Sequence, residues 1–316
     1  MRVLAVDVGA SRIRVAFFKG EEIVWRREAK TPREGDSLSV ARAIAELAPP
    51  LERFDVVSVA TIGPLDLRRG WVVNTPNNPL RSFAIRDPLV EVYKAPVRVL
   101  NDCVAAAWGE YVLARRRRVR NLLYVTISSG IGGGAVVDGN LLLGRDGNAH
   151  EIGHFVVDYE SDLLCGCGGR GHWEALAGGA NIPKVARSEA LRWREERTEA
   201  QRLAESGALD APTLYSLARR GDRFATYLVE KINRIHAAGL ASSIAAYDPE
   251  IVILGGGVVL NNVDLIVPRV SEKLREYLAQ RPPLIEVTGF GDDAVLYGAL
   301  AVALYPPRSL EDHNIE

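Results

Sequence analysis

Two stretches of the chain share one pattern, an apolar strand followed by a short glycine-containing turn and a second strand. The first covers Asp7–Phe18 and the second covers Thr126–Val137. Repetition of one supersecondary unit in both halves of a chain predicts two related domains. The 316 residues are enough for two hydrophobic cores. Because strand and helix patterns alternate through the rest of the chain, the expected class is α/β.

The hydrophobic periodicity places the other elements around these two turns. We expect strands at Val3–Val8, Ile13–Phe18, Glu22–Ala29, Val56–Ala60, Val97–Leu100, Leu122–Ile127, Ala135–Val137, Ile251–Leu254 and Leu284–Thr288. We expect helices at Ser37–Leu47, Asp102–Ala114, within Leu214–Tyr247, near Asp264–Leu278 and at Asp292–Leu304. The last helix would be capped by Asp292 or Asp293. The smaller first domain would cover residues 1–113 and be completed by the helix near 292–304, and the larger second domain would cover residues 114–291.

The composition argues against several classes of partner. The net charge of −1 gives no general attraction to nucleic acid. The arginine run at residues 115–118 is read as a solvated helix end, with a basic nucleic-acid patch as the less favoured alternative. No window approaches the roughly 20 apolar residues that a membrane helix needs, and the N-terminus lacks a signal-peptide pattern. We therefore expect a cytoplasmic protein with neither nucleic-acid nor membrane partners.

The segment Glu151–Glu174 carries the strongest chemical signal. Its candidate metal ligands are His154, Cys165, Cys167 and His172. Cysteine and histidine at these separations can supply four ligands to one zinc ion. The alternative is a pair of reduced cysteines in a turn with unrelated histidines. The two carboxylates at the ends of the segment indicate that a polar molecule is held beside the metal.

The two glycine turns are candidate phosphate sites. In the first, Gly9 allows close backbone approach, Ser11 offers a hydroxyl and an amide, and Asp7 could hold a hydrated Mg²⁺. In the second, residues 126–134 (TISSGIGGG) form a candidate anion nest. An ordinary hairpin is the alternative in each case. The second turn has neither the Walker nor the dinucleotide fingerprint.

Two further segments remain ambiguous on their own. The glycines at residues 255–257 follow a strand and leave room for a flat group, or they serve close packing. Asp102 lies where a strand ends and a helix begins, so it is either a helix N-cap or a general base facing a cleft.

Taken in order, these motifs resemble the ROK sugar kinases, which belong to the actin-like ATPases. The shared motifs are Asp7-x-Gly-x-Ser, Asn101-Asp102, residues 128–134 (SSGIGGG), Glu151-x-Gly-His154, and Cys165-x-Cys167-Gly-x-x-Gly-x-x-Glu174. The resemblance covers residue 3 to about residue 304. It implies a two-domain actin-like (ribonuclease-H-like) fold with an interdomain cleft that closes on sugar, and a homodimer.

The resemblance also implies an ATP-dependent hexose kinase of the glucokinase type. Asp102 would be the general base for the sugar 6-hydroxyl. The sugar-binding residues would be Gly63, Asn77, Asn101, Asp102, Glu151, His154 and Glu174. The nucleotide site would comprise Asp7, Gly9, Ser11, Arg12, Arg14, Ser129, Gly130, Gly255 and Gly256, with Asp7 holding Mg²⁺ through water. Structural Zn²⁺ would orient His154, whose second ring nitrogen would donate to the sugar.

The chain departs from the family pattern where His172 replaces a third cysteine, Ser128 a glycine, Ser129 a threonine and Ala10 a glycine. Two other functions remain open. A kinase for fructose, N-acetylmannosamine or N-acetylglucosamine would share the same motifs. A sugar-sensing regulator without catalysis is less favoured, because Asp7 and Asp102 are both present and the phosphate strand begins at residue 3, which leaves no room for a helix-turn-helix.

Overall fold

The structure is a computed structural model that describes residues 1–114 and 118–311. Most of the arginine run at residues 115–118 therefore lies outside the described residues. The chain divides into two compact units. The first unit contains residues 1–124, 134–150 and 288–316, and the second contains residues 125–133 and 151–287. No helix in the described part of the chain has an apolar stretch long enough to cross a membrane.

The first unit is built on a five-stranded sheet in the order β3-β2-β1-β4-β8. Its strands are β1 (Arg2–Val8), β2 (Arg12–Lys19), β3 (Glu22–Lys30), β4 (Val56–Thr61) and β8 (Val97–Asn101). The first three form an antiparallel meander, and β4 and β8 add in parallel to β1 and β4. Strands β1 and β4 are buried along most of their length, which explains their continuous apolar sequences.

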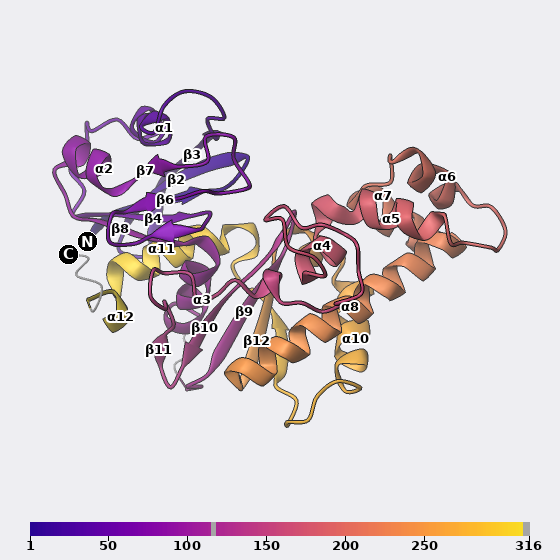
Figure 1. Ribbon diagram of the computed structural model, residues 1–316. Coiled ribbons are helices and arrows are strands. Elements are labelled where there is room, and N and C mark those ends of the chain that lie inside the picture. Colours follow the sequence, from indigo (N-terminus) through magenta and orange to yellow (C-terminus); the bar gives the residue numbers. More distant parts are fainter. Residues whose placement is uncertain (115–117, 312–316) are drawn as a thin grey trace. The chain divides into compact units, whose positions relative to one another are not determined.

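Helices cover both faces of this sheet (Figure 1). Helices α1 (Ser39–Leu47) and α2 (Arg86–Tyr93) lie on one face, and α3 (Asp102–Val112) and α11 (Ala294–Leu304) lie on the other. Helices α3 and α11 approach through glycines, because a Cβ on Gly298 would lie 2.4 Å from the carbonyl carbon of Ala105. This close approach fixes the C-terminal helix against the helix that begins at Asp102.

Several short elements complete the first unit. A three-stranded sheet has the order β5-β6-β7, formed by β5 (Leu65–Asp66), β6 (Trp71–Val72) and β7 (Phe83–Ala84). The strand β11 (Asn140–Leu141), the 3₁₀ helix η3 (Gly291–Asp293) and helix α12 (Arg308–Glu311) also belong to it. The short sheet and α12 had no counterpart among the elements expected from the sequence.

The second sheet has the order β11-β10-β9-β12-β13, which repeats the order of the first sheet. Its other strands are β9 (Leu122–Ile127), β10 (Ile131–Val137), β12 (Ile251–Gly255) and β13 (Leu284–Val287). The boundary between the two units runs within β9 and β10. In each sheet the strand before the glycine turn, β1 or β9, lies between an antiparallel pair (β2–β3 or β10–β11) and a parallel pair (β4–β8 or β12–β13), so the two glycine turns occupy equivalent places.

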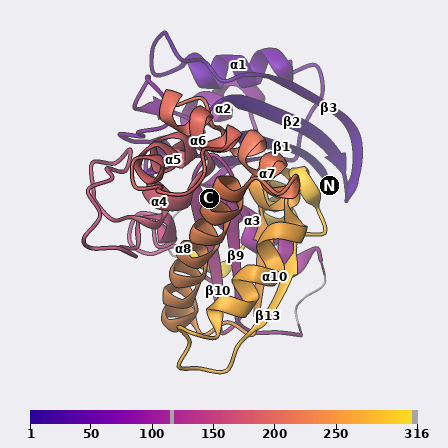
Figure 2. The same cartoon turned by 90° about the vertical axis from the view of Figure 1, so that its right-hand side faces the viewer.

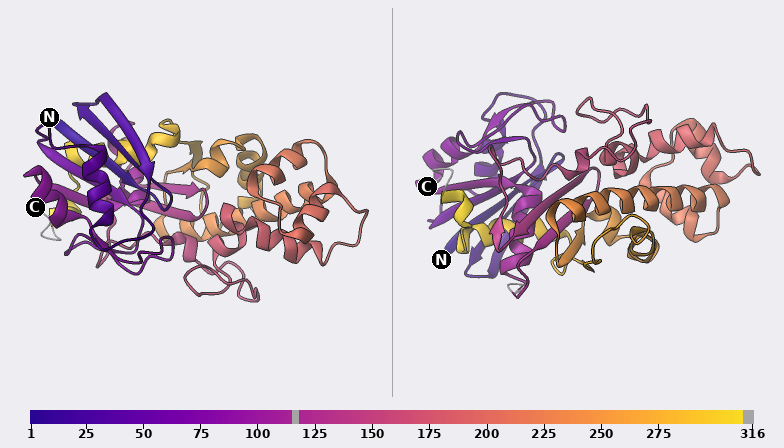
Figure 3. Two further views of the ribbon diagram at one scale, coloured as in Figure 1. Left: turned by 90° about the horizontal axis from the view of Figure 1, so that it is seen from above. Right: turned by 60° about the horizontal axis from the view of Figure 1, so that its bottom comes forward.

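Helices make up most of the second unit. The 25-residue α8 (Arg223–Tyr247) packs beside α10 (Val263–Leu274), as Figure 2 shows. Helices α5 (Ile182–Ala190), α6 (Glu199–Ser206) and α7 (Ala211–Arg219) gather around the N-terminal part of α8, away from the strands (Figure 3). The remaining short helices are η1 (Ile152–His154), α4 (Trp173–Ala177), η2 (Gly179–Asn181) and α9 (Gly257–Leu260).

The expected cap of the last helix is confirmed in position but not in its side-chain hydrogen bond. Helix α11 begins at Ala294, two residues later than the pattern indicated, and η3 precedes it. Asp293 occupies the N-cap position, but its side chain makes no cap hydrogen bond. It pairs with Arg14 and Arg26 instead, because two cations on neighbouring strands attract the carboxylate more strongly than the helix amides do.

Candidate functional site

The first glycine turn joins β1 to β2 and is held by its own backbone. The amide of Gly9 donates to the carbonyl of Arg12 at 2.9 Å. Thr31, at the end of the third strand, donates through its hydroxyl to the carbonyl of Gly9 at 2.8 Å. Its amide also donates to the carbonyl of Ser11 at 3.1 Å. No sequence pattern pointed to Thr31, because its role depends on strand register.

Asp7 faces Arg14 across the β1–β2 hairpin. The Nε of Arg14 donates to Oδ2 of Asp7 at 2.8 Å, and Nη2 lies 2.6 Å from the same oxygen. Burial raises the pKa of Asp7, and the Arg14 guanidinium opposes that effect. Asp293 also contacts Arg14, at 3.5 Å. The predicted magnesium ligand therefore sits in a small network of charged groups inside the first unit.

The carboxyl ends of the parallel strands in the first unit meet at one edge of the sheet. Register places Asp7 beside Ala60 and Thr61 beside Asn101. In open α/β sheets, ligands bind outside this edge. Asp102 follows Asn101 directly as the first residue of α3, so the candidate general base lies at the same edge as the candidate magnesium ligand.

The N-cap of α3 is Asn101 and not Asp102. The Oδ1 of Asn101 accepts from the amides of Cys103 at 2.8 Å and Val104 at 3.2 Å. Oδ1 of Asp102 also accepts from the Cys103 amide, at 2.8 Å. Because its neighbour caps the helix, Asp102 is not needed for that role.

The two weaker sugar-side candidates lie elsewhere in the first unit. Gly63 follows the end of β4 and is half-buried. Asn77 is exposed in the loop before β7, where its amide donates to the Thr75 hydroxyl at 3.3 Å. The next residue, Asn78, is buried and holds the loop through the carbonyl of Pro32.

The second glycine turn joins β9 to β10 and is tight. The amide of Ser128 donates to the carbonyl of Gly130 at 2.9 Å. The carbonyls of Ser128 and Ser129 accept from the amides of Gly179 and Ala180 at 2.8 and 2.9 Å. Neither serine has a positive φ angle, so replacing the family's glycine by Ser128 imposes no backbone strain.

Glu174 connects this second turn to the cysteine segment. Its Oε2 accepts from the amide of Ile131 at 3.0 Å, and its Oε1 lies 3.6 Å from the sulfur of Cys165. A Cβ on Gly130 would lie 2.3 Å from Oε2 of Glu174, so glycine at this position makes room for the carboxylate. The predicted sugar ligand thus also holds a turn amide.

Gly256, directly after β12, allows close packing at this point. Gly256 has a φ of +88°, and a Cβ there would lie 2.5 Å from both the Thr126 hydroxyl and the Ile127 carbonyl oxygen. Only glycine fits such a position without strain. Gly256 therefore brings the end of β12 against the end of β9, immediately before the second turn. Gly255 is the last residue of β12.

The four candidate metal ligands come together in the second unit. Their donor atoms all lie within 4.8 Å of one another. Nδ1 of His154 is 3.2 Å from Nδ1 of His172, 3.7 Å from the sulfur of Cys165 and 3.6 Å from that of Cys167. The sulfur of Cys167 is 3.4 Å from Nδ1 of His172. All three cysteines of the chain are free thiols.

This donor set fits zinc. With Zn–N near 2.05 Å and Zn–S near 2.3 Å, the edges of a tetrahedron are about 3.3 Å for N···N and about 3.6 Å for N···S. The distances above agree with those edges. Backbone geometry supports His172, because a Cβ on Gly169 would lie 2.2 Å from its ring. Glycine at that position lets the histidine turn towards the cysteines.

The other ring nitrogen of His154 faces a carboxylate. Nε2 of His154 is 3.4 Å from Oε2 of Glu151. Burial, and then the nearby Glu174 carboxylate, raise the pKa of Glu151 to about 7. The structure thus brings Glu151, His154 and Glu174 into one cluster beside the candidate zinc ligands. The predicted donation from His154 to a sugar stays a prediction.

A buried hydrogen-bonded pair, Trp173 and His236, lies next to this cluster. The sequence did not predict it. Trp173 is fully buried, and its indole N–H donates to Nδ1 of His236 on α8 at 3.1 Å. A Cβ on Gly239 would lie 2.1 Å from the Trp173 ring. Burial lowers the pKa of His236 to about 3, which keeps it neutral as an acceptor. In the sequence, His236 is a lone histidine within a helical segment, and no local pattern marks it as the partner of Trp173.

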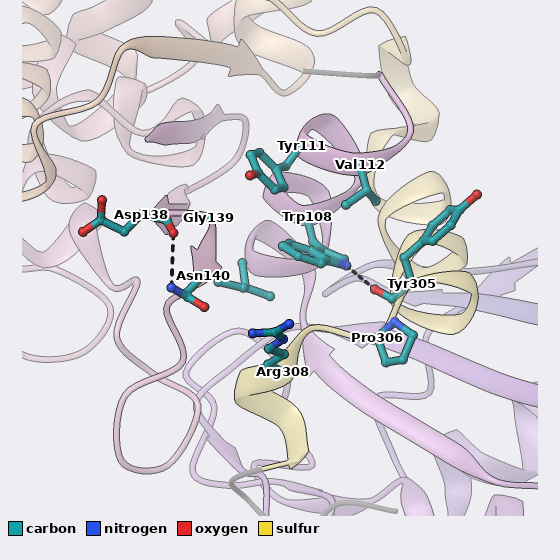
Figure 4. A pocket seen from close by; sticks show the side chains of 10 residues that line it. Trp108, Tyr111, Val112, Asp138, Gly139, Asn140, Tyr305, Pro306 and Arg308 are labelled. Carbon is teal, nitrogen blue, oxygen red and sulfur yellow. Dashed lines mark hydrogen bonds between the residues drawn. The ribbon is translucent and has the colours of Figure 1, made fainter. Parts of the chain in front are cut away.

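A cavity of about 470 Å³ lies in the first unit, apart from these groups. It is lined by the C-terminal half of α3, the turn between β10 and β11, and the segment from Tyr305 to Arg308 (Figure 4). The Trp108 indole donates to the carbonyl of Tyr305 at 2.6 Å on its wall. Among the described residues, none of the predicted site residues lines this cavity.

Comparison with known proteins places these features in a family. The model of the ROK family matches residues 3–305. This chain belongs to the ROK family. A glucokinase of Pyrobaculum calidifontis is 42% identical over 311 residues, which cover 98% of this chain and 97% of that protein. The resemblance drawn from the motifs is confirmed.

Solved structures of ROK proteins share the fold. The ROK hexokinase of Thermus thermophilus has a TM-score of 0.80 at 35% identity, covering 99% of this chain and 100% of that one. A ROK glucokinase of Streptomyces griseus, solved with glucose and AMPPNP, has a TM-score of 0.79 at 27% identity, covering 98% and 100%. The expected α/β class and actin-like ATPase fold are therefore confirmed.

Proposed function

We propose that this ROK protein transfers the γ-phosphoryl group of ATP to the 6-hydroxyl of glucose. The observation that carries the proposal is the 42% identity to a glucokinase across 98% of the chain. The glucose and AMPPNP bound to a ROK neighbour of the same fold support it. In the reaction, a bond forms between the sugar oxygen and the γ-phosphorus, the bond to ADP breaks, and the hydroxyl proton leaves.

Asp102 would accept that proton. It begins a helix, at the carboxyl edge of the first unit's sheet, and its neighbour Asn101 relieves it of the capping role. A positioned carboxylate typically contributes 10²–10⁴-fold to such a step. Phosphoryl transfer otherwise needs little covalent chemistry from a protein, so the remaining residues position the reactants and neutralise charge.

The sugar hydroxyls would be bound mainly by the cluster in the second unit. Carboxyl oxygens accept hydrogen bonds from hydroxyls, and Glu151 and Glu174 would supply such oxygens. In the first unit, Asn101 would offer its Nδ2, because its Oδ1 is engaged by helix amides. Gly63 and Asn77 are weaker candidates.

The nucleotide phosphates would lie at the glycine turns. The proposed groups are Asp7, Gly9, Ser11, Arg12, Arg14, Ser129, Gly130, Gly255 and Gly256. Ser11, Arg12 and Ser129 are exposed, so their side chains are accessible to a ligand. Mg²⁺, held through water by Asp7, would supply charge neutralisation at the phosphates.

Zinc would be structural. His154, Cys165, Cys167 and His172 supply four protein donors, which leaves no open position for a substrate. Its task would be to fix the ring of His154 beside Glu151 and the start of α4, where Glu174 lies.

A coupled ADP-release assay over a panel of sugars, with wild type and Asp102→Asn, tests the proposal. We expect glucose to be phosphorylated and Asp102→Asn to lower kcat by at least about 100-fold. Asp138→Asn, an exposed aspartate of the same unit paired with Arg120, is the matched control. Strong activity on N-acetylmannosamine or fructose with negligible activity on glucose would favour a kinase for another sugar. Unchanged turnover in Asp102→Asn would exclude the general-base role.

Metal analysis tests the zinc site separately. We expect about one zinc per chain and its loss in His172→Ala. Zinc retained in full by His172→Ala would remove that residue from the ligand set. We also propose a cytoplasmic homodimer, on the reduced cysteines and the family resemblance. Light scattering after size exclusion would refute the dimer if it gave the 34.5 kDa monomer mass.

A further inference from the structure

We propose that Arg14 is a positioning residue that acts through Asp7, and that Asp293 holds Arg14 in place. This inference rests on the proposed function, since it concerns how Asp7 meets the magnesium nucleotide. It changes the role of Arg14 from a nucleotide ligand to a group that directs a carboxylate. All of its members belong to the first unit.

Arg14 contacts only one of the two oxygens of Asp7. Both Nε and Nη2 approach Oδ2, at 2.8 and 2.6 Å. Oδ1 of Asp7 accepts no hydrogen bond from the described residues. It is also not one of the side-chain atoms that are buried without a hydrogen-bond partner. Oδ2 is therefore fixed by protein, and Oδ1 is the oxygen that can face a hydrated cation.

The other side of the guanidinium is held by the segment before α11. Nη1 of Arg14 donates to the carbonyl of Asp292 at 2.7 Å and lies 3.5 Å from Oδ1 of Asp293. The second oxygen of Asp293 pairs with Arg26 on β3 at 2.9 Å. Every nitrogen of the Arg14 guanidinium thus has a protein acceptor, which leaves it poorly placed to bind phosphate.

The acid opposite Arg14 on β3 does not compete with Asp7 for the guanidinium. This acid is Glu28, and its carboxylate pairs with Arg12 at 3.6 Å. The side chain of Arg14 is 21% exposed and that of Asp7 is 7% exposed, so solvent screens their contact little. A planar fork is needed to join Asp7 and the Asp292–Asp293 segment at once, and a lysine cannot do this.

The test measures the affinity of a fluorescent ATP analogue with Mg²⁺ and with EDTA. The ratio of the two dissociation constants is the gain from magnesium. We expect Arg14→Gln to lower this gain about tenfold, the effect of about 1.4 kcal/mol, and to leave the affinity in EDTA unchanged. Arg14→Lys should behave similarly. Arg27→Gln, on β3 with its guanidinium over Trp25, is the control and should match wild type.

Each other outcome decides the matter. An equal loss of affinity with and without magnesium would show that Arg14 binds the nucleotide directly and would overturn the inference. A wild-type magnesium gain retained in Arg14→Gln would do the same. If Arg14→Gln does not fold, Asp293→Asn, which leaves the contact with Asp7 in place, should lower the gain about threefold, and no effect would refute the proposal.

Failure of the proposed function gives a different result. A wild-type protein that binds the analogue with no magnesium gain would contradict the kinase mechanism and this inference together. A wild-type protein that shows the gain but phosphorylates no sugar would leave the role of Arg14 supported and contradict only the kinase assignment.

Discussion

The two glycine turns occupy equivalent positions in two sheets of the same strand order, yet they are held in different ways. The first is surrounded by charged side chains, with Asp7 and Arg14 in contact and Asp293 behind them. The second is held by backbone hydrogen bonds and by one carboxylate, that of Glu174, for which Gly130 leaves room, and Gly256 packs tightly against the end of β9 just before this turn. The same strand–turn–strand arrangement therefore has a different role in each half of the chain. Charges direct a carboxylate at the first turn, and tight packing shapes the second.

The largest expected effect comes from adding one methyl group at Gly256, which packs against the end of β9 just before the second turn, and it is compared with the same change at Gly9 in the first turn. Gly256→Ala should cost about 3 kcal/mol of unfolding free energy, because a positive φ and a backbone clash act together. Gly9→Ala should cost less than about 1 kcal/mol, because its Cβ would lie 3.1 Å from the Arg12 carbonyl oxygen at an ordinary φ. Urea denaturation of both variants measures the difference. Equal losses of unfolding free energy in the two variants would contradict the proposed difference between the two turns.

The next largest expected effect is a loss of stability in acid, caused by the buried pair of Trp173 and His236 in the second unit. The pKa of His236 is lowered to about 3, so the folded protein stays neutral while the unfolded chain binds a proton below about pH 6.5. The contribution of neutral His236 to the unfolding free energy is therefore fully present above pH 6.5. It falls as the pH drops, by about 2 kcal/mol at pH 5. Denaturation at pH 7.5 and 5 measures it.

His236→Gln sharpens this test, because glutamine can accept from Trp173 but does not titrate. The loss between pH 7.5 and 5 should shrink by about 2 kcal/mol in this variant. An unchanged loss would mean that His236 is not the titrating group. His150 in the first unit has a pKa lowered by burial to about 4, so the same substitution there gives the matched comparison.

The smallest expected effect is on stability at the first turn. Asp7→Asn should change the unfolding free energy by less than about 1 kcal/mol, because the cost of burying the carboxylate offsets its attraction to Arg14. The magnesium gain in nucleotide affinity should fall strongly in the same variant. A loss of several kcal/mol would show that the ion pair holds the turn together.

The sequence predicted the local features well. The hydrophobic pattern gave β9 (Leu122–Ile127) at its observed bounds, and β1, β2 and β4 within about two residues. The structure also brings the four predicted ligands of the cysteine segment, including His172, into one cluster. Short elements such as β5–β7 were missed, because two-residue strands carry too little periodicity to be seen.

What the sequence alone determined was the α/β class, the two turns and the family, because each depends on spacing within a short segment. Tertiary structure decided which groups those segments meet. Asp293 lies 279 residues from Arg14, and His236 lies 63 residues from Trp173. Such contacts follow from strand register and helix packing, which no local pattern encodes. For this reason a residue expected to cap a helix instead anchors the arginine that directs Asp7.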